Sequence, residues 1–204
     1  MRVIGITGGI GSGKTTVCNI LRTLGCEIFS ADLAAKALQE RDPDIIAGIK
    51  ALFGEDSYTG DVPNRKKIAE VAFQNPEKLA ALNRLIHPKV FECFETAKKA
   101  AAQKGVKALV KEAAILFESG GAKQVDSTIA VLARQDLRFK RLQERGLTKE
   151  EIEQRMAAQL SDDELRTRAD YVIENNGSLE DLERSVKITL EKILSSSTPV
   201  SINR

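Results

Sequence analysis

The chain contains few aromatic residues and carries little net charge. Its 204 residues include no tryptophan, and phenylalanine and tyrosine together make up only 4% of them. Proteins that bind single-stranded nucleic acid stack bases on aromatic rings, so this scarcity argues against such a partner. The formal net charge of +2 gives no strong attraction to nucleic acid or to an anionic membrane surface. We therefore expect neither as a partner.

Histidine and cysteine are also scarce. The single histidine and the three cysteines lack the spacing of a structural zinc site, and no two cysteines form a C-x-x-C pair. We expect Cys18 and Cys26 to be buried thiols, in a first helix and a second strand. No apolar run approaches membrane-spanning length, and an apolar strand beginning at residue 2 leaves no room for a signal peptide. These features predict a cytoplasmic protein.

A glycine-rich stretch near the N-terminus carries the strongest motif. Residues 8–16 read GGIGSGKTT and match the pattern G-x-x-x-x-G-K-[ST], with an apolar strand before it and an amphipathic helix after it. Glycine permits the backbone conformations that wrap N–H groups around phosphate oxygens, and a helix N-terminus adds further donors. The alternative, a glycine-rich turn that only joins strand to helix, is disfavoured by an eight-position match with these flanks.

This loop predicts a nucleoside triphosphate site. Lys14 is placed to reach the β- and γ-phosphates, and the Thr15 hydroxyl is placed to ligate Mg²⁺. We expect the triphosphate to contact the loop and the start of the helix: Gly9, Ile10, Gly11, Ser12, Gly13, Lys14, Thr15 and Thr16.

The remaining pattern is typical of an α/β protein. Four further strands are expected, at residues 26–29, 107–112, 127–132 and 170–173. Asp32 follows the second strand and Glu112 ends the third, at the sheet edge where α/β proteins bind ligands. Asp32 has an alternative role as the N-cap of the next helix. For Glu112 the alternatives are contact with a metal or with a substrate that accepts a phosphoryl group, or simple solvation at the strand end.

A helical insertion separates two of these strands. Residues 55–64 are rich in turn formers and predict a polar loop, and residues 65–104 are helical throughout. Asn75-Pro76 and His87-Pro88 are expected to break this stretch into three helices. The insertion, at about 61–104, has the character of a substrate-binding subdomain.

A charged helical stretch covers about 134–168. Within it, Thr148 with Glu151 and Ser161 with Glu164 fit the capping box at the start of a helix. Most of its cations are expected to form a solvated face. Phosphoryl transfer needs cations over the γ-phosphate and needs water excluded, so we expect one or two arginines to act from a mobile lid.

Several different short motifs are spread along nearly the whole chain. They are GGIGSGKT at 8–15, AD at 31–32, NR at 64–65, LIHP at 85–88, LFESG at 116–120, RL at 141–142, AQ at 158–159, AD at 169–170 and VIENNGS at 172–178. The LIHP tetrapeptide and the I-x-N-x-G-S segment make the combination specific. In these motifs the chain resembles the dephospho-coenzyme A kinase family.

The resemblance implies a single P-loop kinase domain over 1–204 with the α/β fold of the nucleoside monophosphate kinases. Its parts would be a parallel five-stranded core, at about 1–60, 105–133 and 169–195, with the helical insertion and the lid described above. The implied reaction transfers the γ-phosphate of ATP, with Mg²⁺, to the ribose 3′-hydroxyl of dephospho-CoA. This is the last step of coenzyme A synthesis.

The resemblance also assigns roles to residues. Asp32 would orient or deprotonate the attacking hydroxyl, with Lys14 as a second catalytic residue and Arg141 acting from the lid. One departure concerns Ser30, which stands where the family often has an aspartate, and this leaves more of the chemistry to Asp32.

Three more residues are assigned to binding. By the same likeness, Arg65 and His87 would help hold the acceptor, and Asn175 would lie near the adenine of ATP. His87 precedes a proline, so a structural role as a turn former or cap at the start of a helix is its alternative.

Three other functions remain to be distinguished. The nearest is another small-molecule or nucleoside kinase of the same fold. A GTPase-like switch would need an N-K-x-D motif to read guanine, and the sequence has none. A nucleic-acid-dependent ATPase is disfavoured by the modest charge and the low aromatic content.

Overall fold

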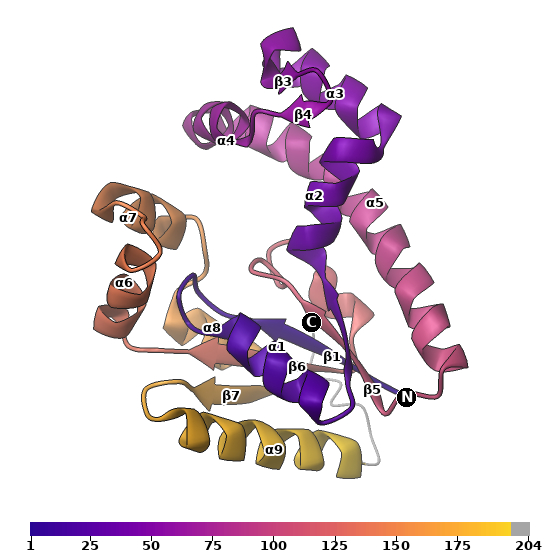
Figure 1. Cartoon of the computed structure of the whole chain (residues 1–204), viewed down its shortest axis with the longest axis vertical. Helices are drawn as coiled ribbons and strands as arrows, with labels where there is room; N and C mark the ends of the chain where they lie inside the picture. The colour runs from indigo at the N-terminus through magenta and orange to yellow at the C-terminus, as the bar shows by residue number, and fades with distance from the viewer. Residues whose placement is uncertain (197–204) are drawn as a thin grey trace. The chain divides into compact units, whose positions relative to one another are not determined.

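The computed structural model describes residues 1–196 of the chain, apart from the Phe73 side chain (Figure 1). The backbone divides into two compact units. One comprises Met1–Ser30 and the chain from Lys98 onward, and the other comprises Ala31–Ala97. The helical insertion expected at about 61–104 therefore overlaps a unit that already begins at Ala31.

A parallel sheet forms the centre of the first unit. Its five strands run in the order β2-β5-β1-β6-β7. Their bounds are β1 (Arg2–Thr7), β2 (Glu27–Ser30), β5 (Ala108–Glu112), β6 (Ser127–Leu132) and β7 (Tyr171–Glu174). Each bound lies within a residue of the prediction, and the predicted α/β fold with a parallel five-stranded sheet is confirmed.

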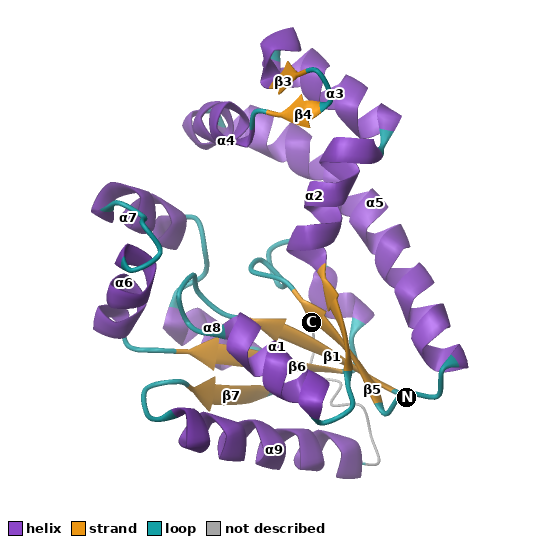
Figure 2. Cartoon of the chain, viewed as in Figure 1, coloured by secondary structure: helices purple, strands orange, loops and turns teal. Residues whose placement is uncertain are grey.

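Helices cover both faces of this sheet. On one face, α1 (Lys14–Thr23) and α9 (Leu179–Ser195) pack on a continuous apolar core (Figures 1 and 2). The side chains of strand β6 alternate between the two faces of the sheet. Ile129 and Val131 belong to this core. The alternate residues Ala130 and Leu132 pack with Leu165 of α8 on the other face. Apolar residues on both faces explain why the strand reads as an unbroken apolar run.

Three helices lie between β6 and β7. They are α6 (Gln135–Gln143), α7 (Lys149–Ala157) and α8 (Asp162–Arg168). Both predicted capping boxes are confirmed: Thr148 and Glu151 cap α7 reciprocally, and Ser161 and Glu164 cap α8. Two orphan backbone N–H groups are satisfied at each of these helix starts. The short 3₁₀ helix η2 (Gly121–Gln124) precedes β6.

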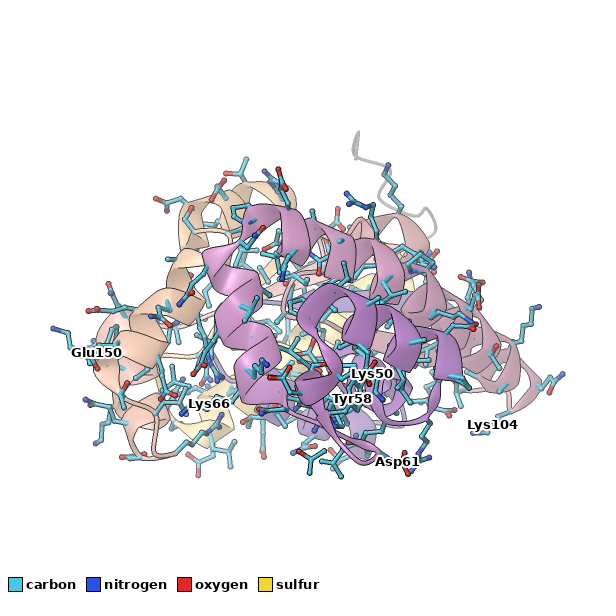
Figure 3. All side chains as sticks on the ribbon, turned by 90° about the horizontal axis from the view of Figure 1, so that it is seen from above. Lys50, Tyr58, Asp61, Lys66, Lys104 and Glu150 are labelled. Carbon is cyan, nitrogen blue, oxygen red and sulfur yellow. The ribbon has the colours of Figure 1, made fainter. Side chains whose placement is uncertain are left out.

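The second unit is mainly helical. It holds α2 (Ala31–Arg41), α3 (Pro43–Phe53), η1 (Glu55–Ser57), β3 (Tyr58–Thr59), β4 (Val62–Pro63), α4 (Arg65–Gln74) and most of α5 (Pro76–Gln103). The prediction of a plain loop at 55–64 was wrong, because β3 and β4 form an antiparallel hairpin. Tyr58 anchors it by donating to the Gln39 carbonyl at 2.7 Å, and the Lys50 ammonium lies over its ring (Figure 3).

The predicted helix break at His87-Pro88 was also wrong. Helix α5 continues through Pro88, although proline cannot donate the hydrogen bond to the carbonyl four residues earlier. Ile86, Val90 and Phe94 are buried at a spacing of four on one face of the helix. This packing outweighs the loss of one hydrogen bond. The predicted break at Asn75-Pro76 is confirmed, since α4 ends at Gln74 and α5 begins at Pro76.

Candidate active site

The glycine-rich loop between β1 and α1 has the backbone that a phosphate cradle needs. Gly8, Gly11 and Gly13 have φ values of 147°, 79° and 101°, which residues with a side chain rarely adopt. A side chain at Gly8 is also excluded sterically, because a Cβ there would lie 2.2 Å from the Val131 carbonyl oxygen. The loop ends at the N-terminus of α1, where unpaired N–H groups favour an anion.

Lys14 is the first residue of α1 and turns back over the loop. Its Nζ donates to the Gly8 carbonyl at 2.8 Å and to the Gly9 carbonyl at 3.4 Å. Thr15 and Thr16 follow in the first turn, and Thr15 is exposed. The Lys14 ammonium therefore lies against the loop, and the exposed Thr15 follows it in the first turn of α1.

Arg141 and Asn175 also contact this loop. Arg141 of α6 donates to the Gly11 carbonyl at 3.3 Å and to the Asn175 carbonyl at 3.1 Å. The Asn175 side chain is only 7% exposed and donates to the Ser12 carbonyl at 2.8 Å. The structure therefore brings together the loop and two residues that follow it by more than 125 positions.

Two further residues contact the loop, and the sequence-based prediction missed their importance. Arg138 Nε donates to the Ile10 carbonyl at 2.9 Å, and the Ile10 N–H donates to Gln159 Oε1 at 2.8 Å. Arg138 lies three residues before Arg141, on the same helix face. That spacing, and the AQ motif that contains Gln159, were the only sequence signals for these contacts.

Glu112 lies at the carboxyl end of β5, level with Ser30 at the end of β2. The Ser30 hydroxyl donates to Glu112 Oε2 at 2.8 Å. An aspartate at position 30 would instead place a second negative charge beside Glu112, and the repulsion between two neighbouring carboxylates is unfavourable. Ser30 instead gives Glu112 a neutral hydroxyl donor.

Asp32 lies two residues after the end of β2, in the first turn of α2, and it is exposed. Helix α2 begins at Ala31, so the alternative in which Asp32 is the N-cap of this helix is wrong. A negative charge in the first turn is favoured by the helix dipole. The exposed Asp32 is therefore accessible at the start of α2.

Arg65 and His87 belong to the second unit. Arg65 opens α4 and pairs with Glu40 at 2.6 Å, and both side chains are about two-fifths exposed. Its other terminal contact is a 3.4 Å hydrogen bond to the Lys36 carbonyl. His87 lies inside α5 and stacks on Phe91, with the ring centroids 6.4 Å apart. The alternative role for His87 at a helix start is wrong, because α5 begins eleven residues earlier.

The thiols in the first unit are buried, as predicted. Burial raises the pKa of Cys18 to about 12, with a smaller contribution from the nearby Glu112 carboxylate and opposing contributions from Arg22 and Lys14. Burial also raises the pKa of Cys26, which lies directly before β2. Both thiols are therefore neutral side chains of the core near neutral pH.

Residues 1–196 contain neither a candidate metal cluster nor a candidate membrane span. Within that range, no three or more His, Cys, Asp and Glu side chains are grouped so that they could hold a metal ion. None of the helices in the same range combines the length and the apolar character needed to cross a bilayer.

Comparison with known families identifies the relatives of this chain. The family model described as dephospho-CoA kinase matches residues 2–181. A dephospho-CoA kinase from Chlorobaculum tepidum is 49% identical over 197 residues, which cover 94% of this chain and 95% of that protein. The chain belongs to the dephospho-CoA kinase family.

Solved structures agree with this membership. A crystal structure from Thermus thermophilus superposes with a TM-score of 0.80 at 35% identity, covering 94% of this chain and 97% of that one. A dephospho-CoA kinase from Campylobacter jejuni superposes with a TM-score of 0.69 at 25% identity, covering 94% and 96%. The predicted family, the P-loop kinase fold and the prediction of a kinase are confirmed. Membership in this kinase family also implies use of a nucleotide.

Proposed function

We propose that this member of the dephospho-CoA kinase family transfers the γ-phosphate of ATP to the ribose 3′-hydroxyl of dephospho-CoA, which completes coenzyme A synthesis. The observation that carries the proposal is the glycine loop with Lys14 lying over it, in a chain 49% identical to a dephospho-CoA kinase. The new bond joins the 3′-oxygen to the γ-phosphorus. The bond from that phosphorus to the β,γ-bridging oxygen breaks, and ADP leaves.

Asp32 is the proposed partner of the attacking hydroxyl. A neutral sugar hydroxyl is a weak nucleophile, and a carboxylate within hydrogen-bond reach orients it and accepts its proton. Support comes from the position of Asp32 two residues beyond a strand end, in the first turn of a helix, with an exposed carboxylate. Such a helper contributes on the order of 10²–10⁴-fold to the rate.

Cations are proposed to stabilise the transferred group. Lys14 and Arg141 both reach the loop carbonyls, so small side-chain movements suffice to exchange those contacts for phosphate oxygens. In kinases, Mg²⁺ takes one or two protein oxygens and fills its shell with phosphates and water, so no cluster of ligands is required. The exposed Thr15 hydroxyl fits that requirement, and Mg²⁺ there would neutralise charge on the phosphates.

Arg65, His87 and Glu112 are the proposed acceptor contacts. The Arg65 guanidinium suits the phosphate groups of dephospho-CoA, and its present partner is a half-exposed carboxylate that an anionic substrate can replace. Glu112 can accept a hydrogen bond from a substrate hydroxyl, as it now accepts one from Ser30. The adenine contact of Asn175 and a cytoplasmic location remain predictions.

The test is an acceptor panel with ATP and Mg²⁺. Dephospho-CoA, nucleosides, nucleoside monophosphates and a no-acceptor control are compared by kcat/KM for ADP release, with the products identified by mass spectrometry. We expect dephospho-CoA to exceed every other acceptor by at least about 100-fold, since a site built for polar groups strongly rejects compounds that leave them unpaired. Preference for a nucleoside or a monophosphate would favour another kinase of this fold. Equal ADP release without any acceptor would favour a nucleotide switch.

A further inference from the structure

Side chains hold three successive carbonyl groups of the glycine loop. Arg138 Nε donates to the Ile10 carbonyl at 2.9 Å, and Arg141 donates to the Gly11 carbonyl at 3.3 Å. The Asn175 amide donates to the Ser12 carbonyl at 2.8 Å. Two of the donors come from α6, and the third follows β7.

Anchored carbonyls fix the direction of the neighbouring N–H groups. A trans peptide unit is planar and carries its C=O and the next N–H on opposite sides. Holding the Ile10 and Ser12 carbonyls therefore turns the N–H groups of Gly11 and Gly13 away from the anchoring side chains. The Ser12 N–H closes the turn of the loop by donating to the Gly9 carbonyl at 3.2 Å. Anion-binding loops work through such oriented N–H groups.

Of the two α6 side chains that bond to the loop, Arg138 is the more deeply buried. It is 6% exposed, and its second contact is an ion pair with Asp162, the first residue of α8, at 3.1 Å. The guanidinium packs so closely on Gly9 that a Cβ at that position would lie 2.1 Å from its terminal nitrogen. Burial lowers the pKa of Arg138, and Asp162 opposes that shift.

Burying the charge of Arg138 is costly, and its ion pair with Asp162, whose side chain is 39% exposed, returns little net stability. A role in orienting the loop explains why a charged side chain occupies this position, where an apolar residue of similar volume would satisfy packing. The planar fork of arginine also suits two partners in different directions, here a carbonyl and a carboxylate.

We propose that Arg138 is a positioning residue for the nucleotide phosphates, which holds the Ile10–Gly11 peptide in its binding orientation and ties the loop to the start of α8. This inference rests on the proposed use of the loop as the ATP site. Arg138 acts through the loop backbone and needs no contact with the phosphates.

The test compares nucleotide and acceptor affinity in Arg138→Gln by isothermal titration calorimetry. We expect the Kd values for MgATP and MgADP to rise about tenfold or more, which corresponds to about 1.4 kcal/mol, because the charged hydrogen bond that orients the Ile10–Gly11 peptide is lost. The Kd for dephospho-CoA should stay within about twofold, since the Gly11 N–H that Arg138 orients serves only the nucleotide. Arg138→Lys keeps the charge but loses the fork, so its Kd values should lie between those of wild type and Arg138→Gln.

Arg184→Gln is the matched control. Arg184 also pairs with a carboxylate, Asp181 at 3.2 Å, but on the exposed surface of α9. Its nucleotide affinity should equal that of wild type. Far-UV circular dichroism confirms folding, and Asp162→Asn gives a milder variant if Arg138→Gln does not fold.

Two outcomes would overturn the proposal: unchanged MgATP affinity in folded Arg138→Gln, or equal loss of MgATP and dephospho-CoA affinity. If the second, milder variant must be used, unchanged MgATP affinity in Asp162→Asn would overturn it likewise. Wild-type protein that binds no MgATP at all would instead refute the proposed function.

Discussion

The residues assigned to the nucleotide and those assigned to the acceptor differ in how firmly the protein holds them. Around the glycine loop, Arg138 and Asn175 are almost fully buried, and both bond to backbone carbonyls within 3.0 Å. In the second unit, Asp32 is exposed and Arg65 is held by a half-exposed ion pair with Glu40. Exposed pairs of this kind contribute only about 0–1 kcal/mol, so a substrate can replace them.

This difference shows two ways of preparing a site. The loop is pre-organised, because Arg138 and Asn175 already hold its carbonyl groups before any ligand is bound, and such contacts reduce the cost of ordering on binding. The acceptor residues instead keep their functional groups accessible and exchangeable. Variants of the loop should therefore change nucleotide affinity, and variants of the second unit should change the rate or the acceptor affinity with nucleotide affinity intact.

The largest effect is expected at Asp32. Asp32→Asn should lower kcat by at least about 100-fold, because an amide cannot accept the proton of the attacking hydroxyl. Affinity for MgATP should stay within about twofold of wild type, because the proposed partner of this exposed carboxylate is the acceptor hydroxyl and not the nucleotide. Steady-state kinetics and calorimetry check both parts.

Asp61→Asn provides the matched control, because Asp61 is an exposed aspartate of the same unit, in the turn between β3 and β4 (Figure 3). It should leave kcat unchanged. Near-normal turnover in Asp32→Asn would remove this carboxylate from the chemical step.

Arg141 should show the next largest effect. It bonds to the glycine loop and is also proposed to act on the transferred phosphoryl group. Arg141→Ala should lower the single-turnover rate about tenfold or more, because a charged hydrogen bond to the transferred phosphoryl group is lost. The MgATP affinity should fall by a smaller factor. Rapid-quench kinetics measure the rate, and Lys149→Ala, an exposed cation of α7, is the control. An unchanged single-turnover rate would assign Arg141 to loop anchoring alone.

Arg65 should affect only the acceptor. Arg65→Gln should raise the KM for dephospho-CoA by about tenfold, since one charge-assisted contact with a phosphate is lost, and should leave the Kd for MgATP unchanged. Lys67→Gln removes a cation from the same helix, where Lys67 pairs with Asp56. That control should have the wild-type KM. If both variants had the same KM, the Arg65 contact would be excluded.

The thiols should give the smallest effect. At pH 8 a thiol reagent should modify Cys93, which is partly exposed, and should spare Cys18 and Cys26, because burial keeps both in the unreactive neutral form. The pKa of Cys18 rises from 9.0 to about 12 on folding, so its neutral form stabilises the fold fully below pH 9. That contribution is lost as the pH rises from 9 toward 12. Labelling followed by peptide mass spectrometry shows which cysteine is modified first. Modification of Cys18 before Cys93 would contradict the prediction.

The sequence predicted the features that depend on local pattern. Strand bounds, the glycine loop and both capping boxes were found because their causes lie within a few residues of one another. The hairpin at Tyr58–Pro63 was missed although Gly60-Asp61 is a recognised two-residue turn, because each strand has only two residues. Pro88 was misjudged because the burial of Ile86 and Phe94 is a tertiary effect.

The candidate site was predicted less completely than the fold. Residue types and strand ends indicated Lys14 and Asp32, but nothing local indicates that Arg138 reaches Ile10, a partner 128 positions away. Side-chain contacts over such distances depend on how the helices after β6 are packed, and no short pattern encodes that packing. The loop was therefore predictable, and the side chains that orient it were not.

The fate of the γ-phosphate tests the central claim most directly. Enzyme in excess over γ-³²P-labelled ATP is mixed with Mg²⁺ and dephospho-CoA, and the label is followed through a single turnover. We predict that nearly all the label appears in coenzyme A, on the 3′-oxygen of the ribose. Label released mainly as inorganic phosphate, or transferred equally well to an unrelated alcohol, would contradict the assignment of this loop and Asp32 to that reaction.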